Sequence, residues 1–401
     1  MRRWRGLKAL VHDAVDATTD LVAEGHDSTA RTVVRLAKIV IADGPVDTAE
    51  TARRLAMDTV LGTVRFVNRG VEVVTDAGLE AVVAPEADDP PMALRSDALG
   101  SAPWMGDALL GAVNGVVGDH LHRRGNGLDL GMSLRADGTP TGRIAVFVHG
   151  LTTTEWSWSF DAERFLGDPA TNFGTLLRAD LAFTPVWARY NTGRPIAANG
   201  ELLSAELSAL VASWPVPVEE LVLIGHSMGG LVVRSAGDVA KRESAAWLPS
   251  LTRVVCLGTP HQGAALERFG HAAAGVLDAV DHPATRISAS VIRARSEGIQ
   301  DLRYGLRDVP LIDGVAYGFF AGSITKDPAH PMSAMLGDLL VRVPSAEGPH
   351  GLCEGNFSLH TARFGGVRHH ELQVHPDVYA QVRRFCAGEF DAPALAESLD
   401  G

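Results

Sequence analysis

Cysteine is scarce in this sequence, whose 401 residues include only Cys256, Cys353 and Cys386. Three cysteines allow at most one disulfide bond, and none of them has a partner at the C-x-x-C spacing of redox and zinc sites. The disulfide framework of small secreted domains is therefore excluded. The sequence favours reducing surroundings, and we expect a cytoplasmic protein.

Long apolar runs and clusters of basic residues are also missing. No stretch approaches the ~18 uninterrupted apolar residues that a membrane-spanning helix needs. The basic start of the chain meets His12 and Asp13 before its apolar run reaches the length of a signal peptide. Lysine and arginine number 36 against 48 aspartate and glutamate residues, a formal net charge of −12. Without a basic cluster we expect no binding to nucleic acid.

The chain does have the composition of a globular protein, with 46% hydrophobic and 21% charged residues. Residues 1–125 show apolar residues at helical spacing and carry no catalytic motif, and we expect a helical N-terminal region there. In residues 126–390, expected strands alternate with helices, which predicts a mostly parallel sheet covered on both faces. Residues 391–401 form a C-terminal tail in this division.

The sharpest motif is G-H-S-M-G at residues 225–229, which lies between the apolar run LVLI and an amphipathic helix. A G-x-S-x-G in that setting is typical of a nucleophile elbow, a tight turn that exposes a serine at the head of a sheet. The helix N-terminus behind the turn favours developing negative charge. We predict Ser227 as a catalytic nucleophile. The alternative is a helix-capping serine in a glycine-rich turn.

A second motif, V-H-G-L at residues 148–151, ends an earlier expected strand. Acyl transfer needs two backbone N–H donors aimed at the oxyanion of the tetrahedral intermediate. One donor follows the nucleophile, at Met228. We predict the other at Leu151, because Gly150 keeps the loop thin enough for it to approach. His149 itself is interpreted as a structural histidine.

A third motif, L-G-T-P-H-Q-G at residues 257–263, follows another expected strand. Thr259 and His261 are candidates either for lining the pocket or for pinning the loop beside the nucleophile. A role for His261 as the general base is disfavoured, because it precedes any plausible acid in the chain. Trp156 and Trp158, after the oxyanion loop, are candidates for pocket walls or for plain packing, and packing is favoured.

Taken together, GHSMGG, FVHGL, LGTPHQG and the later DLLV and HHELQVHP segments resemble the α/β-hydrolase superfamily. More narrowly, they are similar to bacterial esterases and lipases of the GTPHxG type, including PGAP1-like relatives. The resemblance covers roughly residues 128–390. It implies an α/β-hydrolase fold, here with an N-terminal helical extension. It also implies that residues 264–311 form a helical lid over the acyl pocket, the alternative being a connecting pair of helices.

The resemblance further implies the chain order serine, acid, histidine. The run that matches the family's acid loop starts at Asp338, which we expect to be the catalytic acid. This chain has Leu339 where the family usually has glycine. Asp327, three residues past an expected strand, is the alternative on topology alone.

For the base, the family pattern places a histidine six residues before a His-Pro pair. His375 and Pro376 set that register, so the base maps to His369. The adjacent His370 is the alternative. His375 is interpreted as a cap or packing residue at the start of the final helix, where Pro376 suits the first turn.

These residues predict a serine carboxylic-ester hydrolase. Ser227 attacks the acyl carbonyl, His369 takes its proton and Asp338 orients the histidine. The alternatives are a thioesterase, an acyltransferase or an amidase on the same triad and, in a different class, a non-catalytic binding scaffold. We expect a small-molecule or lipid ester as substrate, with polyesters as a further class, and no cofactor. No metal-site spacing is visible. The acyl chain, the alcohol and the oligomeric state are left open.

The N-terminal helices expected in residues 1–80 must bury their apolar faces against something. The basic residues around Trp4 suit an anionic membrane surface, but acidic residues follow from Asp13 onward. A lipid-binding helix would keep its polar face basic. We therefore favour packing on the hydrolase domain or on a neighbouring subunit over peripheral membrane contact.

Overall fold

The structure is a computed structural model of the chain. The sheet and the residues discussed below lie in the larger of its two compact units, Met92–His122, Asp129–Arg286 and Arg295–Gly401. The expected helices of residues 1–101, most of the expected lid and the C-terminal tail lie outside the described residues. The described residues are Ala9, 102–264, 296–306, 309–323, 325–326, 338, 341, 343–347 and 356–390.

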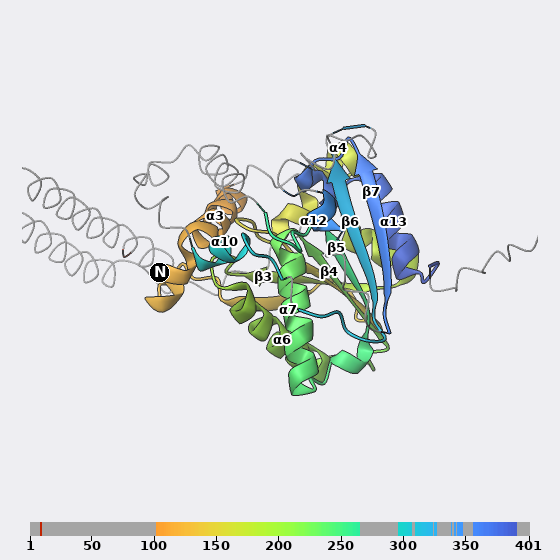
Figure 1. Cartoon of the computed structure of the whole chain (residues 1–401), viewed down its shortest axis with the longest axis horizontal. Helices are drawn as coiled ribbons and strands as arrows, with labels where there is room; N and C mark the ends of the chain where they lie inside the picture. The colour runs from red at the N-terminus through yellow and green to blue at the C-terminus, as the bar shows by residue number, and fades with distance from the viewer. Residues whose placement is uncertain are drawn as a thin grey trace, which may run out of the picture. The chain divides into compact units, whose positions relative to one another are not determined.

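In the described part of the chain, seven strands form one sheet in the order β1-β3-β2-β4-β5-β6-β7 (Figure 1). Only β1 runs antiparallel to its neighbour, and the other pairs are parallel. This sheet confirms the mostly parallel α/β architecture predicted from the sequence. The strands are β1 (Met132–Ala136), β2 (Arg143–Val148), β3 (Thr184–Tyr190), β4 (Glu220–His226), β5 (Leu251–Leu257), β6 (Ala316–Ser323) and β7 (Ser358–Gly365).

The central strands are continuous apolar runs because both of their faces are covered. In β2 every residue after Arg143 is buried, and in β4 every residue after Glu220 is buried. Such uninterrupted runs are typical of parallel strands that have helices on both sides. The edge strands β1 and β7 instead mix exposed and partly buried residues. The burial pattern therefore places the core at β2, β4 and their neighbours.

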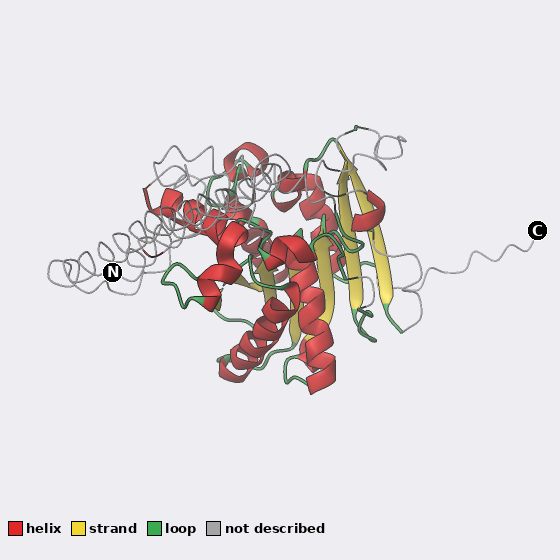
Figure 2. Ribbon diagram, turned by 60° about the vertical axis from the view of Figure 1, so that its left-hand side comes forward, coloured by secondary structure: helices red, strands yellow, loops and turns green. Residues whose placement is uncertain are grey.

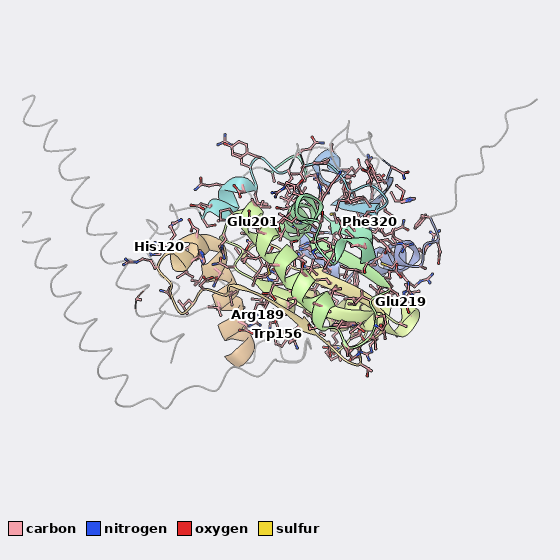
Figure 3. All side chains as sticks on the ribbon, turned by 90° about the horizontal axis from the view of Figure 1, so that it is seen from below. His120, Trp156, Arg189, Glu201, Glu219 and Phe320 are labelled. Carbon is pink, nitrogen blue, oxygen red and sulfur yellow. The ribbon has the colours of Figure 1, made fainter. Side chains whose placement is uncertain are left out.

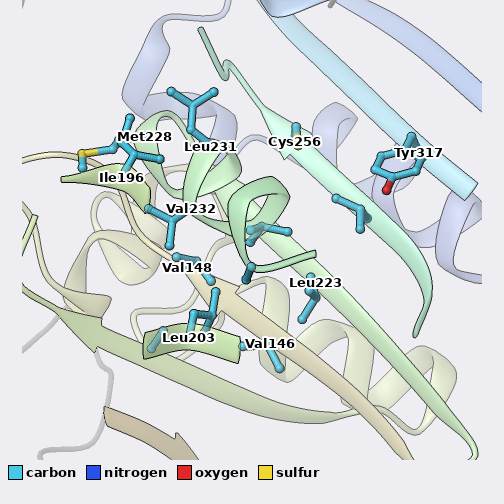
Figure 4. Packing of buried hydrophobic residues seen from close by; sticks show 14 of the residues in the cluster. Val146, Val148, Ile196, Leu203, Leu223, Met228, Leu231, Val232, Cys256 and Tyr317 are labelled. Atoms are coloured by element: carbon cyan, nitrogen blue, oxygen red, sulfur yellow. The ribbon is translucent and has the colours of Figure 1, made fainter. Parts of the chain in front are cut away.

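Helices cover both faces of the sheet (Figure 2). On one face, Leu203 of α6 and Leu231 of α7 join a buried cluster with strand residues such as Val146 (Figure 4). On the other face, Leu177 of α5 and Val378 of α13 belong to a second cluster. The helices are α3 (Ala102–Arg123), α4 (Ala162–Leu166), α5 (Phe173–Leu181), α6 (Ile196–Ser213), α7 (Met228–Glu243), α10 (Glu297–Asp301), α12 (Val343–Ala346) and α13 (Pro376–Cys386). The short 3₁₀ helices are η2 (Glu155–Ser159), η3 (Leu248–Ser250) and η5 (His369–Gln373).

Helix α3 packs against the loops that follow β2 and β3. A β-carbon added at Gly115 would lie 2.5 Å from the Thr152 side chain, and one added at Gly118 would lie 1.9 Å from that of Asn191. The helix is kinked at Val117. Residues 102–122 therefore contact the loops around the sheet, while the domain boundary expected at residue 125 stays a prediction. None of the helices in the described part of the chain combines the length and the apolar character needed to cross a membrane.

Candidate active site

Ser227 is the single residue between the end of β4 and the start of α7. Its backbone has φ 55° and ψ −123°, a conformation that a residue with a side chain rarely adopts. The turn is held by hydrogen bonds from the Ser227 N–H to the Leu257 carbonyl (2.8 Å) and from the Gly230 N–H to the Ser227 carbonyl (3.1 Å). Gly229 must be glycine, since a β-carbon there would lie 2.2 Å from the Val148 carbonyl oxygen. The G-x-S-x-G turn is thus built as a strained elbow.

His369 and Asp338 are joined by a hydrogen bond. His369 Nδ1 lies 2.7 Å from Asp338 Oδ2, and both side chains are buried. The other carboxylate oxygen, Oδ1, accepts a hydrogen bond from the Val341 N–H at 2.8 Å. His369 Nε2 is also buried and has no hydrogen-bond partner among the described residues. An ionised Asp338 accepts the Nδ1–H, so the lone pair of His369 is left on Nε2.

His226 connects this pair to the elbow. Its Nε2 lies 3.0 Å from the His369 carbonyl oxygen, and the two rings are 4.7 Å apart. Burial, reinforced by the neighbouring His369, lowers the pKa of His226 well below its ordinary value. The ring is therefore neutral, and its Nε2–H donates to that carbonyl. In the described residues no hydrogen bond joins Ser227 Oγ to His369 Nε2.

The end of β5 also touches the pair. Gly258 has φ 58°, and a β-carbon there would lie 3.1 Å from both Asp338 Oδ2 and His369 Cε1. Because β2, β4 and β5 are parallel neighbours, their carboxyl-terminal ends lie side by side at one end of the strands. The structure therefore brings Ser227, Asp338 and His369 to the carboxyl-terminal end of the sheet from three separate segments of the chain.

The loop after β2 lies beside the elbow. A β-carbon on Gly150 would be 3.2 Å from the Ser227 Cβ, so the backbone of the loop passes directly over the serine. The Leu151 N–H makes no hydrogen bond within the described residues. The Met228 N–H lies in the first turn of α7, where a helix leaves its amides without acceptors. Within the described residues, therefore, neither the Leu151 N–H nor the Met228 N–H has a backbone acceptor, and both belong to residues next to the elbow or to the loop that passes it.

His149 supports this loop without entering the site. Its carbonyl accepts a hydrogen bond from the Tyr190 hydroxyl at 2.8 Å, and its ring stacks on the Tyr190 ring at 4.5 Å. Burial lowers the pKa of His149 to about 3, so the ring is neutral near pH 7. This position fits the structural role expected for His149.

The third motif ties its loop to α7. His261 is fully buried, with Nδ1 3.0 Å from the Arg234 guanidinium and its ring stacked 4.0 Å from Phe319. A β-carbon on Gly230 would lie 2.0 Å from Thr259 Oγ1, so the threonine packs on the first turn of α7. Both side chains therefore pin the loop beside the nucleophile, the second of the two roles considered for them. Their part in lining a pocket stays a prediction.

Trp156 and Trp158 are buried in the hydrophobic cluster that also contains Leu177 of α5 and Val378 of α13. Trp156 donates its indole N–H to Asp107 of α3 at 3.1 Å. Arg189 binds the same carboxylate at 2.8 Å, so Trp156 belongs to an ionic cluster under α3 (Figure 3). Trp158 is fully buried against Phe147, with ring centroids 5.0 Å apart. Both positions are those of packing residues.

The alternative residues lie elsewhere. His370 is exposed, with its ring 6.1 Å from Phe160, and desolvation lowers its pKa. His375 is the N-cap of α13, where its ring accepts a hydrogen bond from the Asp377 N–H at 3.3 Å, as predicted. Asp327 lies outside the described residues. The described part of the chain holds no group of three or more His, Cys, Asp or Glu side chains that could bind a metal ion.

Sequence reasoning missed two contributors to the site. His226 is inside the elbow motif, yet only the folded chain reveals its bond to the His369 backbone. Helix α3 carried no motif, but the small residues Gly111 and Gly115 four positions apart were a readable sign of close backbone contact. Neither contact follows from local sequence alone.

Comparison with known proteins agrees with this topology. Residues 191–289 match the family model of the PGAP1-like alpha/beta domain. The chain has the α/β-hydrolase fold. The fold class expected from the sequence is therefore confirmed, and the match covers the part of the chain that carries the elbow. No curated protein matches the chain.

Among solved structures, the chain is similar at low identity to several esterases and lipases. The mature form of the Bacillus licheniformis lipase BlEst2 is 17% identical, with 62% of this chain and 97% of that chain covered and a TM-score of 0.41. A lipase-esterase related protein from Clostridium acetobutylicum is 14% identical, with 64% and 98% covered and a TM-score of 0.37. A thermophilic esterase from Thermogutta terrifontis is 14% identical, with 64% and 93% covered and a TM-score of 0.38.

Proposed function

We propose that this protein is a serine carboxylic-ester hydrolase. The observation that carries the proposal is the pairing of a strained serine elbow with a histidine that is bonded on one side and free on the other. Ser227 has φ 55°, and His369 is bonded at Nδ1 to Asp338 (2.7 Å), while its Nε2 has no partner in the part of the chain that the structure describes. Such a histidine is arranged to take a proton from a serine hydroxyl.

In the first half of the reaction, Ser227 Oγ attacks the acyl carbonyl while His369 Nε2 takes the hydroxyl proton. The negative charge of Asp338 stabilises the imidazolium that forms. His369 then gives the proton to the departing alcohol oxygen, and the carbon–oxygen bond of the ester breaks. The acyl group remains on Ser227 as an ester.

In the second half, His369 activates a water molecule, which attacks the acyl-enzyme and releases the carboxylic acid. Both halves pass through a tetrahedral intermediate with a negatively charged oxygen. The N–H groups of Met228 and Leu151 have no backbone acceptor among the described residues, so we assign them to that oxygen. Fixed donors of this kind stabilise charge without having to reorganise during the reaction.

A binding scaffold would not need the strain at Ser227. A non-glycine residue in a sparsely populated conformation costs about 1–3 kcal/mol and persists only where the surroundings enforce it. Here the Leu257 carbonyl and the contact between Gly229 and Val148 enforce it. This favours catalysis over the scaffold alternative. A thioesterase or an acyltransferase would use the same groups. Assays with different acyl donors and acyl acceptors distinguish these activities.

The test is a burst of nitrophenol release from an activated nitrophenyl ester, together with labelling by a fluorophosphonate probe. We expect both in the natural chain, neither in Ser227→Ala, and both in the control Ser213→Ala on α6. Hydrolysis and labelling that persist in folded Ser227→Ala would overturn the proposal. Nitrophenyl esters of increasing chain length, a triglyceride emulsion, a solid polyester and a thioester then define the substrate class.

A further inference from the structure

Thr152, directly after the donor residue Leu151, is held in a strained backbone conformation. Its φ is 62°, a value that is unusual for any residue with a side chain and most costly for a β-branched one. Thr152 is buried, and its hydroxyl donates to the Leu151 carbonyl at 2.6 Å. The peptide plane that joins Leu151 to Thr152 is therefore held in place. The preceding plane, which carries the Leu151 N–H, is held by a hydrogen bond from Thr153 Oγ1 to the Gly150 carbonyl at 2.9 Å.

Two neighbours enforce this conformation from outside the loop. The Thr152 N–H donates to Oγ1 of Thr192, which follows β3, at 3.2 Å. On the other side lies Gly115 of α3, where a β-carbon would come 2.5 Å from Thr152 Cγ2, 2.8 Å from its Cα and 2.9 Å from its N. Two of these three atoms are backbone, so the loop could not yield by turning a side chain.

Helix α3 is itself fixed at this point. The Gly115 carbonyl accepts a hydrogen bond from Ser296 Oγ at 2.6 Å, and the Val116 carbonyl accepts one from the Ser296 N–H at 3.1 Å. Both carbonyls precede the kink at Val117. The surface of α3 that faces Thr152 is thus held in place and does not slide along the loop.

We propose that Gly115 and Thr192 are positioning residues that clamp Thr152 and so aim the Leu151 N–H at the oxyanion. The inference rests on the proposed function, because the donor matters only if an oxyanion forms at Ser227. It assigns a role to α3, a helix in which the sequence shows no catalytic motif. A residue keeps a strained backbone conformation only where its surroundings enforce that conformation. The contacts of Thr152 with Gly115 and Thr192 enforce it here.

The experiment compares two matched pairs of variants. Gly115→Ala pushes a methyl group into the Thr152 backbone, whereas the control Gly174→Ala on α5 makes a clash of similar size, 2.6 Å from Trp187, far from the loop. Thr192→Val removes the acceptor of the Thr152 N–H with little change in shape, and Thr192→Ser keeps it. If Gly115→Ala does not fold, the comparison of Thr192→Val with Thr192→Ser still tests the positioning role.

The measured quantities are kcat, KM, the melting temperature and the inhibition constant of a boronic acid. A boronate forms a tetrahedral adduct on the serine, with one oxygen in the position of the oxyanion. We expect kcat to fall between about 10-fold and about 10³-fold in Gly115→Ala and Thr192→Val, the upper limit being the loss of one oxyanion donor. Boronate affinity falls with kcat while KM stays within about twofold, because the ground-state ester does not use the donor fully.

Gly174→Ala is expected to lower the melting temperature without changing kcat. Thr192→Ser is expected to keep the kcat and the melting temperature of the natural chain. If Gly115→Ala and Thr192→Val lose only thermal stability, as the control does, the proposed positioning role is wrong, while the proposed ester hydrolase is unaffected. If Ser227→Ala keeps the full activity of the natural chain, the proposed function itself fails. The two failures are therefore distinguishable.

Discussion

At the scale of single residues, Asp338 is the carboxylate with the most restricted surroundings in the site. It is 1% exposed, and its two oxygens face different donors, the Val341 N–H and His369 Nδ1. An amide in its place could keep the shape but would present an N–H to one of these two donors. The identity of this one atom therefore decides which nitrogen of His369 carries the proton.

Asp338→Asn is expected to lower kcat by roughly 10³- to 10⁴-fold while the protein stays folded, since the amide favours the wrong histidine tautomer. Steady-state hydrolysis of a nitrophenyl ester measures the loss, and circular dichroism checks the fold. Asp327→Asn serves as the control and should change kcat little. The opposite pattern would move the acid to Asp327.

His369→Ala is expected to abolish hydrolysis as completely as Ser227→Ala, because residues that act as a unit are lost together. His370→Ala should retain substantial activity, since the His370 ring faces Phe160 rather than the Asp338 carboxylate. Burst amplitudes measured on all three variants provide the comparison. A fully active His369→Ala would exclude it as the base.

Buried histidines give the fold its own dependence on pH. His149, His226 and His261 all have a pKa lowered by burial, to about 3 for His149. The unfolded chain takes up protons on these rings below pH ~6.5, whereas the folded chain does not. The stability that these neutral rings contribute is therefore fully present above pH ~6.5 and is lost as the pH falls below that value. For His149 the loss continues until its folded-state pKa of about 3 is reached.

At pH 5, about 1.5 units below the unfolded pKa, His149 alone is expected to cost about 2 kcal/mol of unfolding free energy. Urea denaturation at pH 7 and pH 5 measures the difference. In His149→Gln, the mean slope of stability against pH between these values should be lower by about 1 kcal/mol per unit. An unchanged slope would mean that His149 is not neutral in the folded state.

At the scale of elements, α3 is attached to the sheet through an ionic cluster as well as through its glycines. Arg189 of β3 contacts Asp107 of α3 and Glu155 of η2, each at 2.8 Å. Burial disfavours the charge, but the two carboxylates more than offset this and raise the pKa of Arg189 above its ordinary value. The guanidinium thus holds two buried carboxylates together.

Arg189→Gln is expected to destabilise the protein by about 3–5 kcal/mol, because it removes the cation that contacts two buried carboxylates. The triple variant Asp107→Asn, Glu155→Gln, Arg189→Met should recover most of that loss, since it removes the two carboxylate charges together with the cation. Chemical denaturation of both variants checks this. A triple variant as unstable as Arg189→Gln would mean that the cluster does not act through charge.

The elements also explain how far the sequence could predict the site. The elbow at Ser227 was readable because tight local geometry demands glycine at fixed spacings, and Gly229 against Val148 illustrates the demand. The pairing of His369 with Asp338 was reached only through family resemblance, since 31 residues separate them. The spacing of Gly111 and Gly115 indicates a close backbone contact on α3, but only tertiary packing makes Thr152 the partner of Gly115.

At the scale of the whole molecule, the strands from β2 to the edge strand β7 lie in the sheet in nearly the same order as in the sequence. Apart from β3, which lies on the other side of β2, the spatial order β2-β4-β5-β6-β7 is also the order in sequence. In Figure 1 the blue strands β6 and β7 lie together at that edge. Within the larger unit, the residues assigned to the site come from all along this series: Leu151 after β2, Ser227 after β4, Asp338 after β6 and His369 after β7.

This order has a consequence for the protein during its synthesis. A ribosome releases β2 and β4 first, so the elbow and its neighbouring loop can form while the segment with His369 is still inside the exit tunnel. On the proposed mechanism, the nascent chain then carries the serine without its base, and we expect it not to cleave esters before its sheet is complete. Chains arrested with His369 in the tunnel should resist a fluorophosphonate, and the same chains extended by a C-terminal linker should react. Labelling of the shorter arrested chains would show that Ser227 is reactive without the last strand and its histidine.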